Sequence, residues 1–494
     1  MIKRLIAVLA AMMMLASVAL ADTAFTMAGY DDSSSHDWNN NFALQRLEEK
    51  SGITFTYTQY TDEDEWTKAK AGYKAGSADL PDVLFKAQLS DAEAETLYDA
   101  GVLIDLKPYL EEYAPNLWAL LQEHPEWEKA VTDKNGRILT LPNLNPLQNN
   151  NAIWINTVWL KRVNKEMPTT AEELTEVLRA FKTGDPNNNG KADEVPLTFT
   201  GMWDLRYLAH AFGIYSNDYY VVLEDGVVKE TATSEENRAF LTWVHQLWSE
   251  GLIDSNGFTS TESTRQITDS DATITYGIVM GPSIMNLLPS SELDNYQVVM
   301  PLTYNGKQVY RRLLNDVIRG TFAITTACKD PATLVAWADY FYTEEGCYLT
   351  QAGKLDSEYT VYSDGKWSWT DDATTVSETI LPDYTIADGA AMPMYTPVEY
   401  QLNYDDEQTH AAVVQLYELN GYALDPYPNV ILDNATRTRV DTIWATLGEY
   451  TETAMARFVT GDIALTDENW QAYCDRVYAL GMQEMLDIWQ SAIE

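Results

Sequence analysis

Short apolar strands that alternate with amphipathic helices constrain the fold of this chain more than any other feature of its sequence. Residues 24–60 read AFTMAGY, then NFALQRLEEKSG after a polar loop, then ITFTYTQY, and the helical segment stops at Gly52. A further helix, strand and helix are predicted at residues 66–75, 82–85 and 92–99. This β-α-β order predicts an α/β fold with a parallel sheet.

The later helices carry ordinary start and stop signals. Thr170 and Glu173 predict a capping box at the start of one helix. Further helices are predicted after Ser234 and from Pro331, and Gly481 divides the last stretch into two. Helices and strands alternate to the end of the 494 residues, which predicts a second α/β lobe.

The charge balance excludes one class of partner. The chain has 33 basic and 74 acidic residues, which gives a formal net charge of −41. Such a field repels phosphate backbones and anionic membranes. We therefore expect no nucleic-acid partner.

The first residues have the form of a secretory signal peptide. Lys3 and Arg4 precede an apolar run at 5–18, and the small residues Ala19 and Ala21 suit cleavage before Asp22. An N-terminal membrane anchor is the alternative, but the run is short for a bilayer of about 30 Å. With 1–21 as a signal peptide and no other long apolar window, we expect secretion to the periplasm or cell exterior.

The three cysteines bear on anchoring and on redox state. All lie far from the predicted cleavage site, so the sequence predicts no lipid anchor. Their odd number leaves one thiol unpaired, and Cys328 with Cys347 is a possible disulfide. Cys474 shares a helical face with Trp470 and Val477, which favours a buried structural thiol.

The chain is rich in aromatic residues, with 15 Trp, 30 Tyr and 12 Phe. Several lie in polar surroundings, such as Trp38 after a serine-rich loop and Trp203 before Asp204. Carbohydrate sites combine ring platforms with polar side chains that bind hydroxyl groups. The alternative is that most of these rings only pack the core.

The segment at 185–194, DPNNNGKADE, has the spacing of the front half of a calcium loop. Oxygen-bearing side chains stand at loop positions one, three, five and nine, with glycine at six. The twelfth position, which is glutamate in an EF-hand, is Pro196, so this is not an EF-hand. The predicted calcium ligands are Asp185, Asn187, Asn189, the Lys191 carbonyl, Asp193 and Glu194. A solvated turn built by Asn and Asp is the alternative.

Several further segments resemble a known family. They are LPDVLF at 80–85, GVLIDLKPYLEEYAPNL at 101–117, KNGRILTLP at 134–142, MPTTAEELTEVLRAFK at 167–182, the loop at 185–197, FAITTACKDPATLVAWADYFY at 322–342 and the C-terminal tail. In this order they resemble the extracellular solute-binding proteins of carbohydrate ABC importers. The likeness is to the large branch of alginate-oligosaccharide and lipoprotein-type sugar binders.

The resemblance implies a type II periplasmic-binding-protein fold. Two α/β lobes joined by a hinge would close on a sugar held in the cleft between them. By analogy, lobe one comprises 22–145 and 310–388, and lobe two comprises 146–309 and 389–494. A structural calcium ion in the loop at 185–194 is also implied.

Two departures from the family pattern concern the ligand site and one helix end. Asn156 stands in a strand-to-helix segment where relatives carry an arginine followed by an acidic residue, which indicates an altered cleft contact. The family's Gly-x-Glu-Gly motif reads QAGK at 351–354.

The function expected from these observations is capture of a carbohydrate, an oligosaccharide, for the permease subunits of an ABC transporter. We expect a monomer without catalytic activity. The candidate ligand contacts are Trp38, Asn156, Trp203, Arg206 and Tyr395.

Two other functions stay open. A secreted glycoside hydrolase needs two carboxyl groups about 5 to 10 Å apart in a cleft, and 74 acidic residues could supply such a pair. The sequence has no nucleophile elbow, zinc-binding helix or phosphate loop, and its five histidines are scattered. A binding protein of this fold for a peptide or a sensor partner is the third possibility.

Overall fold

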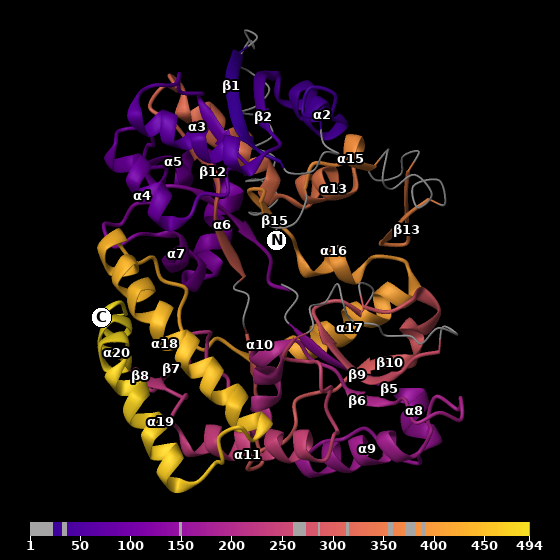
Figure 1. Cartoon of the computed structure of the whole chain (residues 1–494). Helices are drawn as coiled ribbons and strands as arrows, with labels where there is room; N and C mark the ends of the chain where they lie inside the picture. Colours follow the sequence, from indigo (N-terminus) through magenta and orange to yellow (C-terminus); the bar gives the residue numbers. More distant parts are fainter. Residues whose placement is uncertain are drawn as a thin grey trace.

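The computed structural model describes residues 23–31, 37–147, 151–259, 273–284, 287–312, 316–353, 359–370, 381–387 and 391–493. Its elements form two lobes, the upper and lower halves of Figure 1. The predicted signal peptide at 1–21 lies outside the described residues. No helix in the described part of the chain combines the length and the apolar character needed to cross a bilayer.

The upper lobe is built on a six-stranded sheet in the order β15-β4-β12-β3-β1-β2. The bounds of these strands are Met394–Tyr395, Leu141–Leu144, Val317–Ile324, Val83–Phe85, Thr23–Tyr30 and Ile53–Tyr60. β1 pairs in parallel with β2 and β3, as the β-α-β pattern predicts. An entirely parallel sheet is wrong, however, because β12 pairs antiparallel with both β3 and β4. This strand enters the sheet after the chain has returned from the lower lobe, so no short crossover fixes its direction.

Both faces of this sheet are buried. Neighbouring residues of β3 point to opposite faces, and Phe85 and Leu84 accordingly lie in two different apolar clusters. The helices of the upper lobe are α2 (Phe42–Ser51), α3 (Glu63–Ala75), α4 (Asp91–Asp99), α5 (Lys107–Tyr113), α6 (Pro115–Glu123), α7 (Pro125–Val131), α12 (Pro331–Asp339), η5 (Tyr340–Tyr342), α13 (Glu344–Ala352) and α15 (Leu381–Tyr384).

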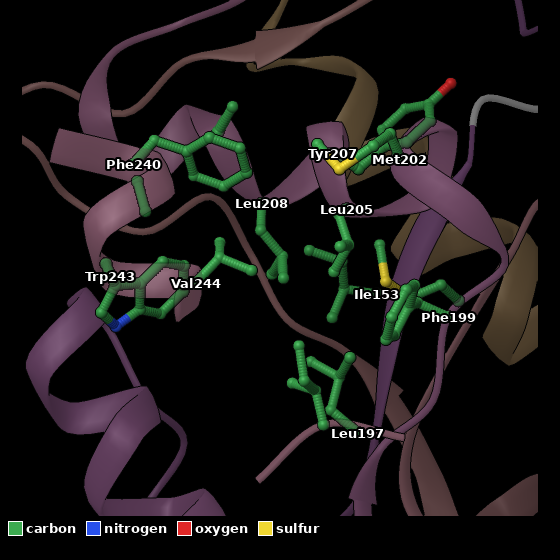
Figure 2. Close-up of a cluster of buried hydrophobic side chains, with 14 of the residues drawn as sticks. Ile153, Leu197, Phe199, Met202, Leu205, Tyr207, Leu208, Phe240, Trp243 and Val244 are labelled. Atoms are coloured by element: carbon green, nitrogen blue, oxygen red, sulfur yellow. The ribbon is translucent and has the colours of Figure 1, made fainter. Parts of the chain in front are cut away.

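The lower lobe is built on a four-stranded sheet in the order β10-β5-β9-β6. Its strands span Tyr296–Val298, Ala152–Asn156, Tyr276–Gly281 and Val195–Leu197. The helices are α8 (Thr157–Arg162), α9 (Ala171–Thr183), α10 (Gly201–Leu205), η1 (Arg206–Phe212), α11 (Glu235–Ser249), η4 (Ser290–Asn295), α17 (Glu407–Asn420), α18 (Asn434–Thr460), α19 (Asp467–Ala479) and α20 (Met482–Ser491). Figure 2 shows the core where α10, η1 and α11 meet the strands.

Three smaller strand pairs complete the fold. These are β7 (Val221–Glu224) with β8 (Val227–Glu230), β11 (Tyr310–Arg311) with β16 (Ala423–Leu424), and β13 (Thr360–Ser363) with β14 (Lys366–Trp369). Helix α16 (Val398–Leu402) lies between the lobes, above α17 (Figure 1).

Two helix-end predictions have different outcomes. Gly481 has φ 114° and separates α19 from α20, which confirms the predicted break. Thr170 caps α9 by accepting from the Glu173 backbone, but the Glu173 carboxylate accepts from Thr169 instead of returning to Thr170. The predicted capping box is therefore only half formed. A complete one occurs at Ser90 and Glu93, at the start of α4.

The three cysteines are free thiols. Cys328 and Cys347 are buried in the upper lobe without the possible disulfide between them. Cys474 is half-buried and packs against the core of the lower lobe.

The chain passes between the two sheets after β4, before β12 and after β15. The predicted boundary at residue 388 would place β15 in the lower lobe, yet β15 pairs with β4 in the upper sheet. The other lobe boundaries stay predictions.

Helix α18 connects the lobes on the side away from α16 (Figure 1). Most of it packs along α11 in the lower lobe, but its first turn is held by the upper lobe. The Lys134 ammonium lies 2.6 Å from the Asp433 carboxylate, and the Asn434 N–H donates to Glu95 at 2.8 Å.

The Asp433 contact predicts a pH-dependent contribution to stability. Its hydrogen bond with Lys134, followed by that with the Thr436 N–H, lowers the pKa of Asp433 from 3.8 to about 2. The contribution is therefore complete above pH 4 and is lost as the pH falls towards 2. Asp433→Asn keeps a capping side chain but removes the charge. We expect this variant to be less stable at pH 6 in urea unfolding, with a difference that shrinks between pH 4 and pH 2. An equal difference at all pH values would contradict the assignment.

Candidate functional site

A pocket of about 270 Å³ lies between the two lobes. Its upper wall comes from β14, α16 and the residues after α16. Its lower wall comes from β5, the residues after β9 and α17, and the buried residues of this wall belong to the core of the lower lobe. The lining residues are Trp154, Ser283, Ile284, Trp367, Trp369, Tyr400, Gln401, Tyr404, Thr409, Ala412, Val413 and Leu416.

The β13–β14 hairpin explains why two tryptophans reach this pocket. Asp364 and Gly365 have φ of 55° and 80°, and two residues with positive φ form the tight turn that suits a hairpin. Side chains two residues apart in a strand share a face, so Trp367 and Trp369 lie together, with ring centroids 5.7 Å apart.

Two rings of the upper wall, Trp367 and Tyr400, are held in place by several contacts. The Trp367 indole N–H donates to the Tyr400 carbonyl at 2.9 Å, and the two rings stack with centroids 4.9 Å apart. The Trp367 backbone N–H donates to the Asn403 carbonyl, and the Trp367 carbonyl accepts from the Asp405 backbone N–H. Because these contacts fix the rings before a ligand arrives, little side-chain freedom remains to be lost on binding.

The lower wall is fixed in a similar way. The Trp154 indole is buried, and its N–H donates to the Gly281 carbonyl at 3.0 Å. Ser283 and Ile284 follow directly after β9. The pocket thus combines rigid ring surfaces with hydroxyl and amide groups from Ser283, Tyr404 and Gln401. Such a surface suits a polar ligand that also has C–H faces.

The structure leaves two of the five predicted ligand contacts accessible. Trp203 on α10 is 40% exposed and packs edge-on against Tyr207, with centroids 5.2 Å apart. Tyr395 on β15 is half-buried, and its ring centroid lies 6.3 Å from that of Trp127. Neither lines the pocket.

The other three predicted contacts are buried. The Trp38 indole donates to Asp31 at 3.1 Å within the upper core. Asn156 caps α8 by accepting from the Trp159 N–H at 3.0 Å. The Arg206 guanidinium lies over the Tyr220 ring, 3.9 Å from its centroid. The structure does not bring the five residues into one site, and their ligand roles stay predictions.

The tryptophans of the hairpin were available as a sequence signal. The turn pair DG at 364–365 is followed by KWSW, with two rings at alternating positions. No sequence pattern, however, places this hairpin against α17 or against Trp154, which are far away along the chain.

The loop at 185–194 forms a compact hydrogen-bonded turn. The Asp185 carboxylate accepts from the Asn189 N–H at 3.1 Å, and the side-chain amides of Asn187 and Asn189 donate to Asp193. These are the bonds of the solvated turn that is the alternative to calcium. The described residues contain no group of three or more His, Cys, Asp or Glu side chains placed to hold a metal.

One atom in this loop nevertheless suits a cation. The Glu194 Oε1 atom is buried without a hydrogen-bond partner. Burial, followed by the nearby carboxylates of Asp193 and Asp185, raises the pKa of Glu194. The Lys191 N–H donates to Asn189 at 2.8 Å, which fixes the backbone whose carbonyl is a predicted ligand. The donor set of carboxylate, amide and carbonyl oxygens fits calcium chemistry.

Comparisons with known proteins bear on the family. No protein-family model matches the chain. Over 321 residues it is 32% identical to the fructooligosaccharide ABC transporter substrate-binding protein FusA of Streptococcus pneumoniae serotype 4. That match covers 63% of this chain and 59% of the relative. Over 165 residues it is 33% identical to lipoprotein LipO of Bacillus subtilis, covering 32% of this chain and 31% of the relative.

Solved structures extend the likeness to almost the whole chain. An extracellular solute-binding protein from Bifidobacterium longum subsp. infantis superimposes with a TM-score of 0.80 at 22% identity, covering 96% of this chain and 98% of that one. FusA from S. pneumoniae in complex with kestose gives a TM-score of 0.72 at 25% identity, covering 95% and 98%. The chain is a relative of the extracellular solute-binding proteins. Its type II fold of two α/β lobes is thereby confirmed, as is the family resemblance.

Proposed function

We propose that this solute-binding protein captures a carbohydrate, an oligosaccharide, outside the cytoplasm and delivers it to the permease subunits of an ABC transporter. The observation that carries the proposal is the ring-lined pocket between the lobes. The relatives support it, because one is named for fructooligosaccharides and another solved homologue is described as HMO binding.

The proposed mechanism is closure of the lobes on the ligand. Trp154 belongs to the lower wall, whereas Trp367 and Tyr400 belong to the upper wall. A sugar held between these walls contacts both lobes only when they are close, so it binds the closed form more tightly and shifts the population towards it. The closed form then presents one surface to the permease.

A thermal-shift screen tests this function against its alternatives. We expect a neutral oligosaccharide such as kestose to raise the unfolding midpoint, because a ligand that binds only the folded state stabilises it. Chromatography should recover the sugar intact. Cleavage would favour the glycoside hydrolase, and a shift with peptides alone would favour a peptide-binding protein of this fold.

We further propose that the loop at 185–194 binds a structural calcium ion. Its ligands would be Asp185, Asn187, Asn189, the Lys191 carbonyl, Asp193 and Glu194. Two similar structures are described as an EF-hand mutant and as a protein without calcium ion, which makes calcium relevant to this fold. The ion would offset the repulsion among the carboxylates and so steady the lower lobe.

Calcium removal gives a direct prediction. Calcium at a hundredfold excess over its dissociation constant should stabilise the protein by about 2.7 kcal/mol, and chelation should reverse this. Glu194→Gln should reduce the response, because one charged ligand is lost. Thermal unfolding with and without chelator measures both. An unchanged midpoint in the wild type on chelation would leave the loop as a hydrogen-bonded turn.

The remaining expectations complete the proposal. Secretion through residues 1–21, freedom from a lipid anchor and a monomeric state are predictions. LipO is named a lipoprotein, so fractionation of cells should include a test for membrane attachment.

A further inference from the structure

The walls of the inter-lobe pocket point to the class of sugar that it accepts. We propose that this pocket is a subsite for an uncharged glycosyl unit and that it rejects uronic acids. The inference rests on the proposed function and deepens it, because it concerns ligand charge at that same site.

The chemistry of the pocket lining favours a neutral ligand. None of the described residues that line the pocket carries a charged side chain. They offer indole and phenol rings, aliphatic groups, hydroxyls and the Gln401 amide. A carboxylate moved from water into such a pocket would lose its hydration without gaining a cationic partner. A neutral sugar loses only hydroxyl hydration, which hydroxyl and amide groups can replace.

The protonation state of Tyr400 and Tyr404 also keeps the lining uncharged. Burial, followed by neighbouring groups including Tyr404, raises the pKa of Tyr400 well above its ordinary value. Burial, followed by the charge of Asp406, raises the pKa of Tyr404. Both phenols therefore keep their protons at neutral pH, so neither adds charge to the wall.

The chain next to the lining residue Tyr404 carries negative charge. Lys366, next to the tryptophans of the hairpin, lies 3.1 Å from Asp405 and is neutralised by it. Asp406 caps α17 and accepts from the Thr409 N–H at 2.8 Å. Glu407 follows in the first turn of α17. Asp405, Asp406 and Glu407 lie along the chain between the lining residues Tyr404 and Thr409, and together with Lys366 they carry a net negative charge, which repels an approaching carboxylate.

The size and position of the pocket also suit a glycosyl unit. A volume of about 270 Å³ lies just below the ~300–1,000 Å³ that is usual for small-molecule sites. It suits one or two sugar units of a longer chain. Trp369 and Tyr404 are half-buried, so each keeps ring surface for a ligand, and α17 faces them from the other lobe.

The experiment is a calorimetric titration of the full mature chain with matched pairs of sugars. The first pair is cellotriose and its C6-oxidised form, and the second pair is α-1,4-galactotriose and trigalacturonate. Kestose is a further neutral probe. We expect at least one neutral sugar to bind and its acidic counterpart, where the pair exists, to bind about 100-fold more weakly. An equal affinity of any acidic partner would overturn the inference.

Three variants connect the selectivity to this pocket. Trp369→Ala should lower the affinity for the neutral sugar about 10-fold, because the substitution removes an aromatic ring on which the sugar can pack. Tyr417→Ala is the matched control: Tyr417 lies on the same α17 that forms the lower wall but is exposed outside the pocket, so binding should not change. Gln401→Lys should move the ratio of acidic to neutral affinity about 10-fold towards the acidic sugar.

The outcomes separate this inference from the proposed function. Tight binding of acidic sugars, or neutral binding that Trp369→Ala leaves unchanged, would overturn the uncharged subsite while keeping a carbohydrate receptor. If no sugar in the panel binds, both proposals are contradicted.

Discussion

Replacing Lys86 with methionine is expected to lower the free energy of unfolding by about 3 to 5 kcal/mol. Lys86 is 1% exposed and Asp31 is fully buried, and the ammonium lies 2.7 Å from the carboxylate. Methionine fills much of the same volume but leaves the Asp31 carboxylate buried without its cation. Such a charge cannot regain its hydration inside the upper core, which is why the expected loss is large. Urea unfolding measured by circular dichroism gives the value.

A double variant separates the charge from the packing. Asp31→Asn together with Lys86→Met removes both charges, so we expect it to recover a substantial part of the loss. The Trp38 indole N–H, which donates to the Asp31 carboxylate, can donate to the amide oxygen of the substituted side chain in its place. A single Lys86→Met variant within 1 kcal/mol of the wild type would contradict this account of the upper core.

Phe240→Ala should destabilise the lower lobe by about 3 to 5 kcal/mol. Figure 2 shows Phe240 on α11 beside Val244 and Leu208, in the core between α11 and η1. The ring is fully buried, and the helices around it cannot close the cavity that its removal leaves. Because this lobe carries the lower wall of the pocket, ligand binding should fall together with stability.

The matched control for this prediction is Tyr417→Ala. It also removes an aromatic ring from a helix of the lower lobe, but this ring is 48% exposed. We expect a change within about 0.5 kcal/mol, as is usual for surface positions. Equal losses for the two variants would mean that burial does not determine the energetics of this lobe.

The sequence predicted the local elements well because their signals are local. Asn41 and Gly52 define α2, Gly481 separates the last two helices, and the parallel contacts of β1 follow from short β-α-β connections. The direction of β12 was not predictable in this way, since its partners in β3 and β4 lie more than 170 residues before it.

The site was less predictable than the fold. Trp38 lies among polar residues, and Asn156 stands in a segment that departs from the family pattern, yet the first packs in the upper core and the second caps a helix. Trp367 and Trp369 have a clear local pattern, but their partners come from β5 and α17, far away along the chain. Residue type indicated the chemistry of the site, whereas its location depends on long-range packing.

The buried ion pair of Asp31 and Lys86 was predictable only in part from the sequence. Asp31 follows β1 and Lys86 follows β3, two neighbouring parallel strands whose carboxyl ends meet at one edge of the sheet. The pairing could have been inferred from the strand order, although the burial of both groups depends on the helices that cover them.

The central claim is that the two lobes capture an intact carbohydrate between them. It is tested most directly by isothermal titration of the mature protein with the sugar that gives the largest thermal shift, followed by chromatography of the recovered ligand. The account predicts saturable binding of one sugar per chain, weakened about 10-fold by Trp369→Ala, with the ligand recovered uncleaved. Recovery of cleaved products, or the absence of saturable binding of any sugar, would contradict it.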